Sequence, residues 1–165
     1  MSTKIINFKP IGIVHTPFKK LQGMPIQPTG AVGVKGQIEI FPELNDGLKD
    51  LDGFSHIILL YNFHKVKESK LKVIPFLDKK VRGVFATRAP RRPNAIGLSI
   101  VKLVEINGNI IQIENVDILD GTPLLDIKPY IPHVDQQEVL KLGWLENKTE
   151  RFEKQISDER FIENE

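Results

Sequence analysis

Residues 97–116 read GLSIVKLVEINGNIIQIENV, two apolar runs on either side of Asn107-Gly108-Asn109. Asn and Gly tolerate the positive φ angles that a tight turn between two strands requires. The flanking runs are rich in Ile, Leu and Val, which favour strands. The sequence therefore predicts an antiparallel hairpin formed by residues 97–106 and 110–116.

Similar patterns occur on both sides of this hairpin. Short apolar or alternating runs predict strands at residues 8–16, 32–41, 54–64, 71–76, 81–87, 117–119 and 124–131, and helical patterns are confined to residues 42–51 and 149–155. Many short strands with few helices indicate an antiparallel barrel or sandwich rather than a doubly wound sheet. No G-x-G-x-x-G follows a predicted strand, so a Rossmann nucleotide site is not expected.

The composition is that of an ordinary globular domain. Of 165 residues, 41% are hydrophobic and 27% are charged, which suits one domain with a sizeable core. There is no cysteine, which excludes disulfides and thiolate metal sites. The histidines lack a metal-binding spacing, the longest apolar run is too short for a bilayer, and no signal-peptide pattern is visible. We expect a cytoplasmic protein without a metal or membrane partner.

The loop that leads into the hairpin, residues 83–99, reads GVFATRAPRRPNAIGLS. Its arginines Arg88, Arg91 and Arg92 lie among two prolines that stiffen the backbone. Guanidinium groups are rarely buried unpaired, so this arginine loop indicates a preformed anion site. Residues 65–92 carry ten Lys or Arg against two acids, a net charge of +8 that is typical of a phosphate-binding surface. For the lysines of residues 67–80, a solvated loop is an equally good interpretation.

Four motifs follow one another along the chain: GIVHTPF at residues 12–18, GFSHIILLYNFH at 53–64, the arginine loop, and DGTPLLDIKPY at 120–130. Each is weak alone, but together they span roughly residues 8–132. With them the chain resembles the TrmO/YaeB (TsaA-like) family of S-adenosylmethionine-dependent tRNA methyltransferases. The resemblance implies a mainly β fold: a small antiparallel β-barrel with short helices, unlike Rossmann methyltransferases. It also implies a homodimer that N-methylates the exocyclic amine of threonylcarbamoyl-adenosine beside the tRNA anticodon.

The resemblance further implies where S-adenosylmethionine binds. The contacts come from the loop before the second strand, the end of strand 54–64, the arginine loop and the D-G-T-P turn. The implied cofactor-binding residues are Gln27, Pro28, His64, Lys65, Arg88, Leu98, Leu119, Asp120, Gly121 and Thr122. Arg88 is our candidate for binding the methionine carboxylate, because a guanidinium group can donate hydrogen bonds to both carboxylate oxygens. A structural salt bridge is the alternative for this residue.

A second set of residues is predicted to bind the RNA substrate. Arg91 and Arg92 are candidates for RNA phosphates, since that role needs charge but no base recognition. Surface arginines without a ligand are the alternative. Asn94 and Lys128 complete the predicted RNA-binding set.

Methyl transfer from a sulfonium mainly needs alignment of nitrogen and methyl carbon, and the nitrogen can lose its proton late. Asp120 and Tyr130 are our candidate proton acceptors. Alternation along residues 126–130 places Tyr130 on one strand face with Asp126 and Lys128, where the three could also form an intrachain network.

We expect a methyltransferase domain over residues 1–140 and a partly helical, acidic extension over residues 141–165. Longer bacterial members of the family carry a C-terminal domain that has no counterpart here after about residue 145. Two alternatives to tRNA methylation therefore stay open. One is S-adenosylmethionine-dependent methylation of a small molecule or another nucleic acid, and the other is a non-catalytic barrel that binds RNA or a nucleotide.

Overall fold

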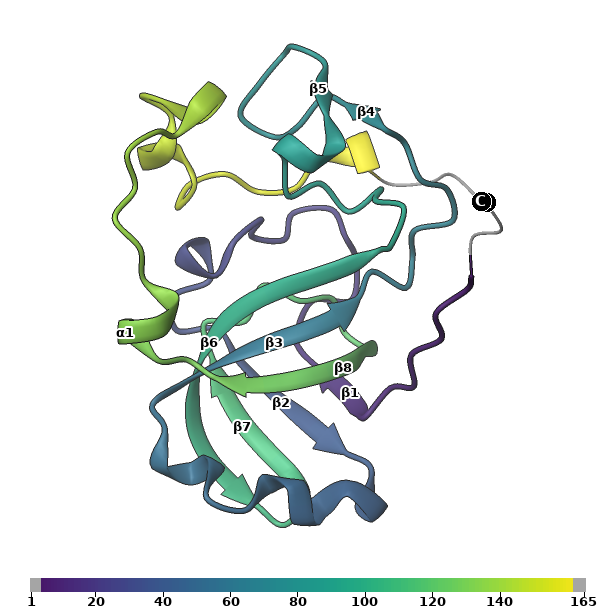
Figure 1. The fold of residues 1–165 in the computed structure, drawn as a ribbon, viewed down its shortest axis with the longest axis vertical. Coiled ribbons are helices and arrows are strands. Elements are labelled where there is room, and N and C mark those ends of the chain that lie inside the picture. Colours follow the sequence, from purple (N-terminus) through teal and green to yellow (C-terminus); the bar gives the residue numbers. More distant parts are fainter. Residues whose placement is uncertain (1–3, 162–165) are drawn as a thin grey trace.

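Six strands form a closed antiparallel barrel in the computed structural model, which describes residues 4–161 (Figure 1). Around the barrel the strands are β1 (Gly12–His15), β2 (Lys35–Ile40), β7 (Ile110–Glu114), β6 (Ile96–Asn107), β3 (His56–Asn62) and β8 (Thr122–Pro129). β8 pairs with β1, which closes the barrel. The predicted mainly β fold with an antiparallel barrel is confirmed.

The predicted hairpin is present as β6 and β7. Asn107 pairs with Ile110, so Gly108 and Asn109 form a two-residue turn, and Gly108 has a φ of 60°. A positive φ at this position matches the twist of the two strands and is cheap for glycine. The turn therefore sets the register of the neighbouring pairs as far as Glu105 and Gln112, beyond which the pairing of β6 with β7 shifts.

Alternation along the strands places one set of apolar side chains inside the barrel. In β6 the buried positions are every second residue from Gly97 to Leu103, and in β3 they are Ile57, Leu59 and Tyr61. Together with side chains of the other strands they form one continuous core. Burial of these Ile, Leu and Val side chains contributes roughly 1.5–3 kcal/mol each.

One inward position of the barrel has no room for a side chain. Gly97 pairs with Tyr61 across β6 and β3, and a β-carbon added at Gly97 would fall within the buried Tyr61 ring. The ring therefore occupies the space that this glycine leaves, and the Tyr61 hydroxyl lies 3.1 Å from Oγ of Ser99.

Four predicted elements differ in the structure. Most of residues 71–76 and 81–87 is loop: only β4 (Lys72–Val73) and β5 (Arg82–Gly83) pair, and a 3₁₀ turn follows at Val84–Ala86. Residues 117–119 form no strand, because the chain turns there to pack against residues 14–18. The predicted helix at residues 42–51 is a pair of 3₁₀ turns, Pro42–Leu48 and Leu51–Gly53, separated by a residue with positive φ.

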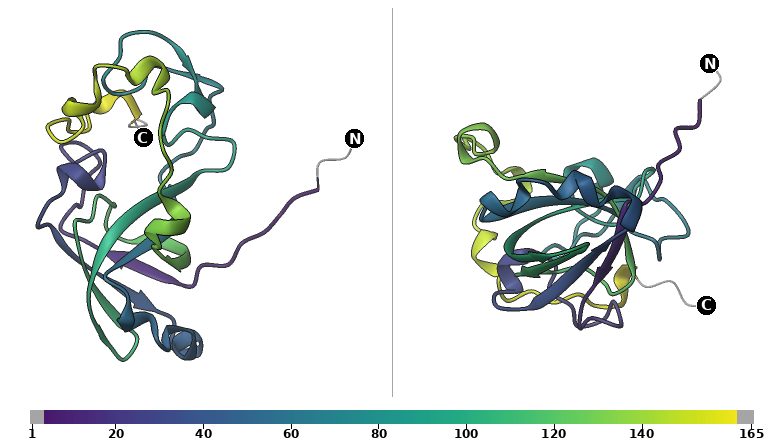
Figure 2. Two further views of the ribbon diagram at one scale, coloured as in Figure 1. Left: turned by 60° about the vertical axis from the view of Figure 1, so that its left-hand side comes forward. Right: turned by 90° about the horizontal axis from the view of Figure 1, so that it is seen from below.

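After β8, a single-turn helix α1 (Pro132–Asp135) and an exposed stretch lead to the C-terminal segment, residues 141–161. This segment contains 3₁₀ turns at Gly143–Leu145, Thr149–Arg151 and Glu159–Phe161 and runs back across the upper end of the barrel (Figures 1 and 2). Backbone hydrogen bonds tie Ser157 to Gly23 and Met24. The last four residues of the predicted extension, 162–165, lie outside the described residues.

Candidate functional site

A cavity of about 1070 Å³ lies where the upper end of the barrel meets the loops around it. Its size is at the upper end of the range for small-molecule sites, ~300–1,000 Å³. Five parts of the chain line it: residues 21–29, 61–66, 75–100, 117–122 and the C-terminal segment. Because these parts are far apart in sequence, only the folded barrel creates the site.

Most of the predicted cofactor-binding residues line this cavity. They are Gln27, Pro28, His64, Lys65, Arg88, Leu98, Leu119 and Thr122. Asp120 and Gly121 of the same predicted set are not part of its lining. The cavity thus brings together the four sequence regions that were expected to meet, and the role of each residue toward a cofactor stays a prediction.

Arg88 reaches into the cavity from the arginine loop and is exposed there. Its Nη1 donates a hydrogen bond of 2.9 Å to Oε1 of Gln27, which immediately precedes the 3₁₀ turn Pro28–Gly30. The amide holds the guanidinium without neutralising it, so Arg88 keeps the full positive charge that an anionic ligand group needs.

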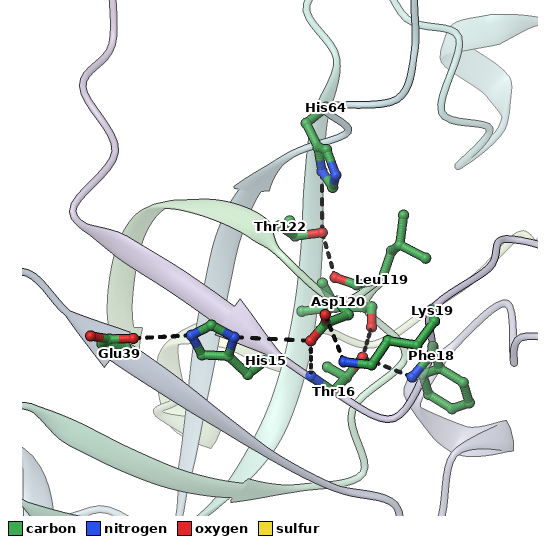
Figure 3. Close-up of polar contacts among 10 residues, drawn as sticks. His15, Thr16, Phe18, Lys19, Glu39, His64, Leu119, Asp120 and Thr122 are labelled. Carbon is green, nitrogen blue, oxygen red and sulfur yellow. Dashed lines mark hydrogen bonds and ion pairs between the residues drawn. The ribbon is translucent and has the colours of Figure 1, made fainter. Parts of the chain in front are cut away.

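His64 follows the end of β3 and contacts the turn at residues 119–122 (Figure 3). Its Nδ1 lies 3.4 Å from Oγ1 of Thr122, and this hydroxyl donates a 2.6 Å hydrogen bond to the carbonyl of Leu119. Burial and the adjacent Lys65 charge lower the pKa of His64. The imidazole is therefore neutral at pH 7 and helps to shape the cavity wall rather than to add charge.

The side chain of Asp120 is held outside the cavity, by contacts with Thr16 and Lys19 (Figure 3). Oδ1 accepts a 3.0 Å hydrogen bond from the backbone N–H of Thr16, and Oδ2 lies 2.7 Å from Nζ of Lys19. These contacts hold its pKa below the usual range, with the Lys19 contact the largest cause. Asp120 lines a separate surface hollow that also includes His15 and Glu39. A carboxylate anchored in this way is a poor proton acceptor for chemistry in the cavity.

Tyr130 lies near the other end of the barrel. Its backbone N–H donates to the carbonyl of His56, the first residue of β3, whereas the residue of β3 that lines the cavity is Tyr61. Tyr130, like Asp120, is not part of the cavity lining. The role of either residue as proton acceptor stays a prediction. Asp126 and Lys128 do form an ion pair, at 2.8 Å.

The predicted RNA-binding residues occupy different positions. Arg92 lines the cavity wall, where its Nη1 donates to the carbonyls of Val84 and Thr87 at 3.1 and 2.8 Å and so organises the arginine loop. Arg91 is half-buried and Asn94 is exposed in the same loop, and neither is part of the cavity lining. Lys128 is exposed on β8. Contact of these residues with RNA stays a prediction.

The C-terminal segment supplies a cavity wall that the sequence did not predict. Trp144 is half-buried, and its Nε1 donates a 2.7 Å hydrogen bond to the carbonyl of Ala86 in the arginine loop. The guanidinium carbon of Arg82 lies 5.6 Å from the centre of the indole, and Lys148 Nζ lies 5.4 Å from it. The one tryptophan of the chain was the available signal for this contact, but it lies in a segment without periodicity.

We expect Trp144→Phe to loosen the C-terminal segment without unfolding the barrel. Phenylalanine keeps an aromatic ring but removes the hydrogen bond to Ala86, at a cost of about 1 kcal/mol. Hydrogen exchange should accelerate severalfold at residues 141–161 and remain unchanged in β3 and β6. Val139→Ala, at an exposed position before the segment, is the control and should change neither. Equal acceleration in the barrel strands would contradict this prediction.

Three hydrogen-bonded polar side chains that the sequence analysis also missed lie at the inner side of the cavity. The Ser99 hydroxyl donates a 2.6 Å hydrogen bond to Oδ1 of Asp117, and the Tyr61 hydroxyl lies 3.1 Å from Ser99 Oγ. All three residues line the cavity. A serine at an inward position of the otherwise apolar strand β6 was the sequence signal that could have revealed these hydrogen bonds.

Residues 4–161 contain neither a metal-binding cluster nor a membrane-spanning helix. No group of three or more His, Asp or Glu side chains there is arranged to hold a metal ion. No helix in that range has the length and apolar character needed to cross a bilayer.

The fold and the site define a closed antiparallel β-barrel, outside the Rossmann class, with a large cavity of aromatic, apolar and cationic side chains. The family model for the tRNA-methyltransferase O N-terminal domain matches residues 13–136, and the chain belongs to this family. A protein of Pyrococcus abyssi named as a probable S-adenosyl-L-methionine-binding protein is 54% identical over 158 residues, covering 96% of this chain and 86% of that protein.

Proteins with a named activity are also similar to this chain. The tRNA (adenine(37)-N6)-methyltransferase of Escherichia coli is 36% identical over 138 residues, covering 78% of this chain and 59% of that enzyme. The crystal structure of TrmO from Pseudomonas aeruginosa superimposes with a TM-score of 0.72 at 34% identity. That match covers 86% of this chain and 63% of the crystallised chain, so this chain spans less than two thirds of the solved structure.

Proposed function

We propose that this chain is an S-adenosylmethionine-dependent tRNA methyltransferase that N-methylates the exocyclic amine of threonylcarbamoyl-adenosine beside the anticodon. The observation that carries the proposal is the convergence of Gln27, His64, Arg88 and Thr122 on one cavity. The family and the names of its relatives support the reaction class and the tRNA substrate. We include in the proposal a methyltransferase domain over residues 1–140 with the extension 141–165, a cytoplasmic location and a homodimer.

The residues around the cavity fit S-adenosylmethionine. Arg88 presents an unneutralised guanidinium, which suits the methionine carboxylate. Aromatic side chains from several parts of the chain, among them Phe63, Phe85 and Trp144, suit the adenine ring and exclude water. Bound there, S-adenosylmethionine supplies an activated methyl group on a sulfonium.

In this proposal the protein acts mainly by positioning. Arg88 and Gln27 fix one end of the methyl donor, and the turn at residues 119–122, tied to His64, fixes another part of the cavity wall. A cavity at the upper end of the size range for small-molecule sites suits a donor with the acceptor base beside it. Holding two reactants in the correct alignment supplies much of the rate enhancement for such a displacement.

A transfer assay with two tRNA substrates tests the proposal. The protein is incubated with methyl-labelled S-adenosylmethionine and tRNA that carries threonylcarbamoyl-adenosine, and the same tRNA without this modification is the control. We expect label in the modified adenosine only, detected by mass spectrometry after nuclease digestion. Equal labelling of both tRNAs would contradict the proposed acceptor.

Binding of S-adenosylhomocysteine separates the remaining alternatives. Binding without transfer to any tRNA would favour methylation of a small molecule or another nucleic acid. Absence of binding at millimolar concentration would favour a non-catalytic barrel that recognises RNA or a nucleotide.

A further inference from the structure

Asp117 is a carboxylate of the cavity wall that neither the sequence motifs nor the donor-binding residues account for. It lies in the irregular stretch after β7 and is half-buried. Ser99 donates to Oδ1 over 2.6 Å, and Tyr61 lies behind Ser99 at 3.1 Å. A carboxylate has two acceptor oxygens, so the Ser99 contact leaves capacity for a further hydrogen bond or a proton.

This carboxylate differs from the other aspartates whose pKa is shifted. Cationic partners hold the pKa of Asp78, Asp120 and Asp158 below the usual range, with Arg82, Lys19 and Arg160 as the respective main causes. For Asp117, burial raises the pKa to about 6, and the Ser99 hydrogen bond and the Arg88 charge oppose that rise only in part. A carboxylate poised near neutral pH on the wall of a cavity is typical of a proton acceptor.

The neighbours of Asp117 keep it able to accept a proton. Burial, followed by the Asp117 charge, raises the pKa of Tyr61 well above its ordinary value. Tyr61 therefore stays protonated and supports Ser99 instead of competing for the proton. The titratable and charged groups that share the cavity, from every element around it, are Tyr61, His64, Lys65, Arg88, Arg92, Glu153 and Asp158.

We propose that Asp117 accepts the proton that the acceptor nitrogen loses during methyl transfer. In this step the nitrogen forms a bond to the methyl carbon, the sulfur–carbon bond breaks, and its electron pair stays on sulfur. The N–H proton passes to the Asp117 carboxylate, which releases it to solvent after the product leaves. The inference rests on the proposed function and gives Asp117 the role for which the sequence suggested Asp120 or Tyr130, neither of which lines the cavity.

Three variants test this role against a structural one. Asp117→Asn keeps an oxygen that can accept the Ser99 hydrogen bond but cannot take up a proton. Ser99→Ala removes a contact that lowers the pKa of Asp117. Asp52→Asn is the matched control, because Asp52 is exposed in the 3₁₀ turn Leu51–Gly53 and is not part of the cavity lining. Thermal unfolding of each variant shows that the barrel is intact.

We expect kcat with modified tRNA to fall at least ~100-fold in Asp117→Asn, the scale of general-base catalysis, and to stay unchanged in Asp52→Asn. The Kd of S-adenosylhomocysteine should change less than about threefold in Asp117→Asn, since the methyl donor does not depend on this carboxylate. In the wild type, kcat/KM should rise about tenfold per pH unit below the pKa of Asp117 and then level. Ser99→Ala should move this rise to higher pH, because the pKa of Asp117 increases.

Several results would overturn the inference. One is an Asp117→Asn protein that keeps its rate and the same dependence on pH, while the wild type transfers methyl groups. Another is a loss of S-adenosylhomocysteine affinity of more than about 30-fold, which would make Asp117 a donor-binding residue. Wild-type protein that binds S-adenosylhomocysteine but transfers nothing to tRNA would overturn the proposed function itself, and the inference with it.

Discussion

Replacing Arg88 with alanine is expected to raise the Kd of S-adenosylhomocysteine about 100-fold, measured by calorimetry. Charge-assisted hydrogen bonds to a carboxylate contribute about 1.5–3 kcal/mol. Arg88 is exposed to the cavity and hydrogen-bonded there by the neutral Gln27 side chain, so its charge is available to a ligand. Because the guanidinium is already held in place, a ligand carboxylate can bind without first ordering it.

Two further variants sharpen this prediction. Arg88→Lys keeps the charge but loses the planar fork, so its Kd should lie between those of the wild type and the alanine variant. Lys102→Ala removes an exposed cation of β6 that pairs with Glu114, away from the cavity, and should leave the Kd unchanged. An Arg88→Ala protein that binds as tightly as the wild type would restrict Arg88 to a structural role.

Gly97→Ala is expected to lower the free energy of unfolding by about 3 kcal/mol, at the upper end of the range for over-packed cores. The new methyl group would overlap the buried Tyr61 ring, and a shift of this ring would break the contact of its hydroxyl with Ser99. Urea denaturation followed by circular dichroism measures the change.

Gly47→Ala is the matched control for this substitution. Gly47 lies in the 3₁₀ turn Pro42–Leu48, and an added β-carbon there meets no atom within 4 Å. We expect its stability to stay within about 0.5 kcal/mol of the wild type, as for other exposed substitutions. Equal stability of the two variants would mean that the barrel relaxes around residue 97 at no cost.

The sequence was most informative where structure is local. The Asn107-Gly108 turn and the alternation of β6 predicted the hairpin, because both depend on neighbouring residues. Residues 81–87 were apolar enough to suggest a full strand, yet only β5 pairs there and a 3₁₀ turn follows. Apolar content alone cannot distinguish a strand from a loop that packs on a second, small core.

In the candidate site, too, the sequence predicted what depends on local motifs and missed what depends on tertiary packing. Motifs predicted that Gln27, His64, Arg88 and Thr122 would converge, and all four line the cavity. They could not reveal that Lys19 and Thr16 hold the Asp120 side chain elsewhere, since that depends on how β1 packs against the turn. The position of Asp117 behind Ser99 and the return of the C-terminal segment are likewise products of tertiary packing.

Closure of the barrel through β1 and β8 also limits how this chain can meet other molecules. Each barrel strand has a partner on both sides, so an incoming peptide or a second copy finds no row of unpaired N–H and C=O groups to extend. Contacts with this part of the molecule have to be made by side chains. Val104 points outward from β6 and is exposed, whereas Leu98 and Ile100 on the same strand face line the cavity. Association through the barrel wall therefore depends on the shape and apolar character of the two surfaces. It does not depend on the pairing of strands between molecules.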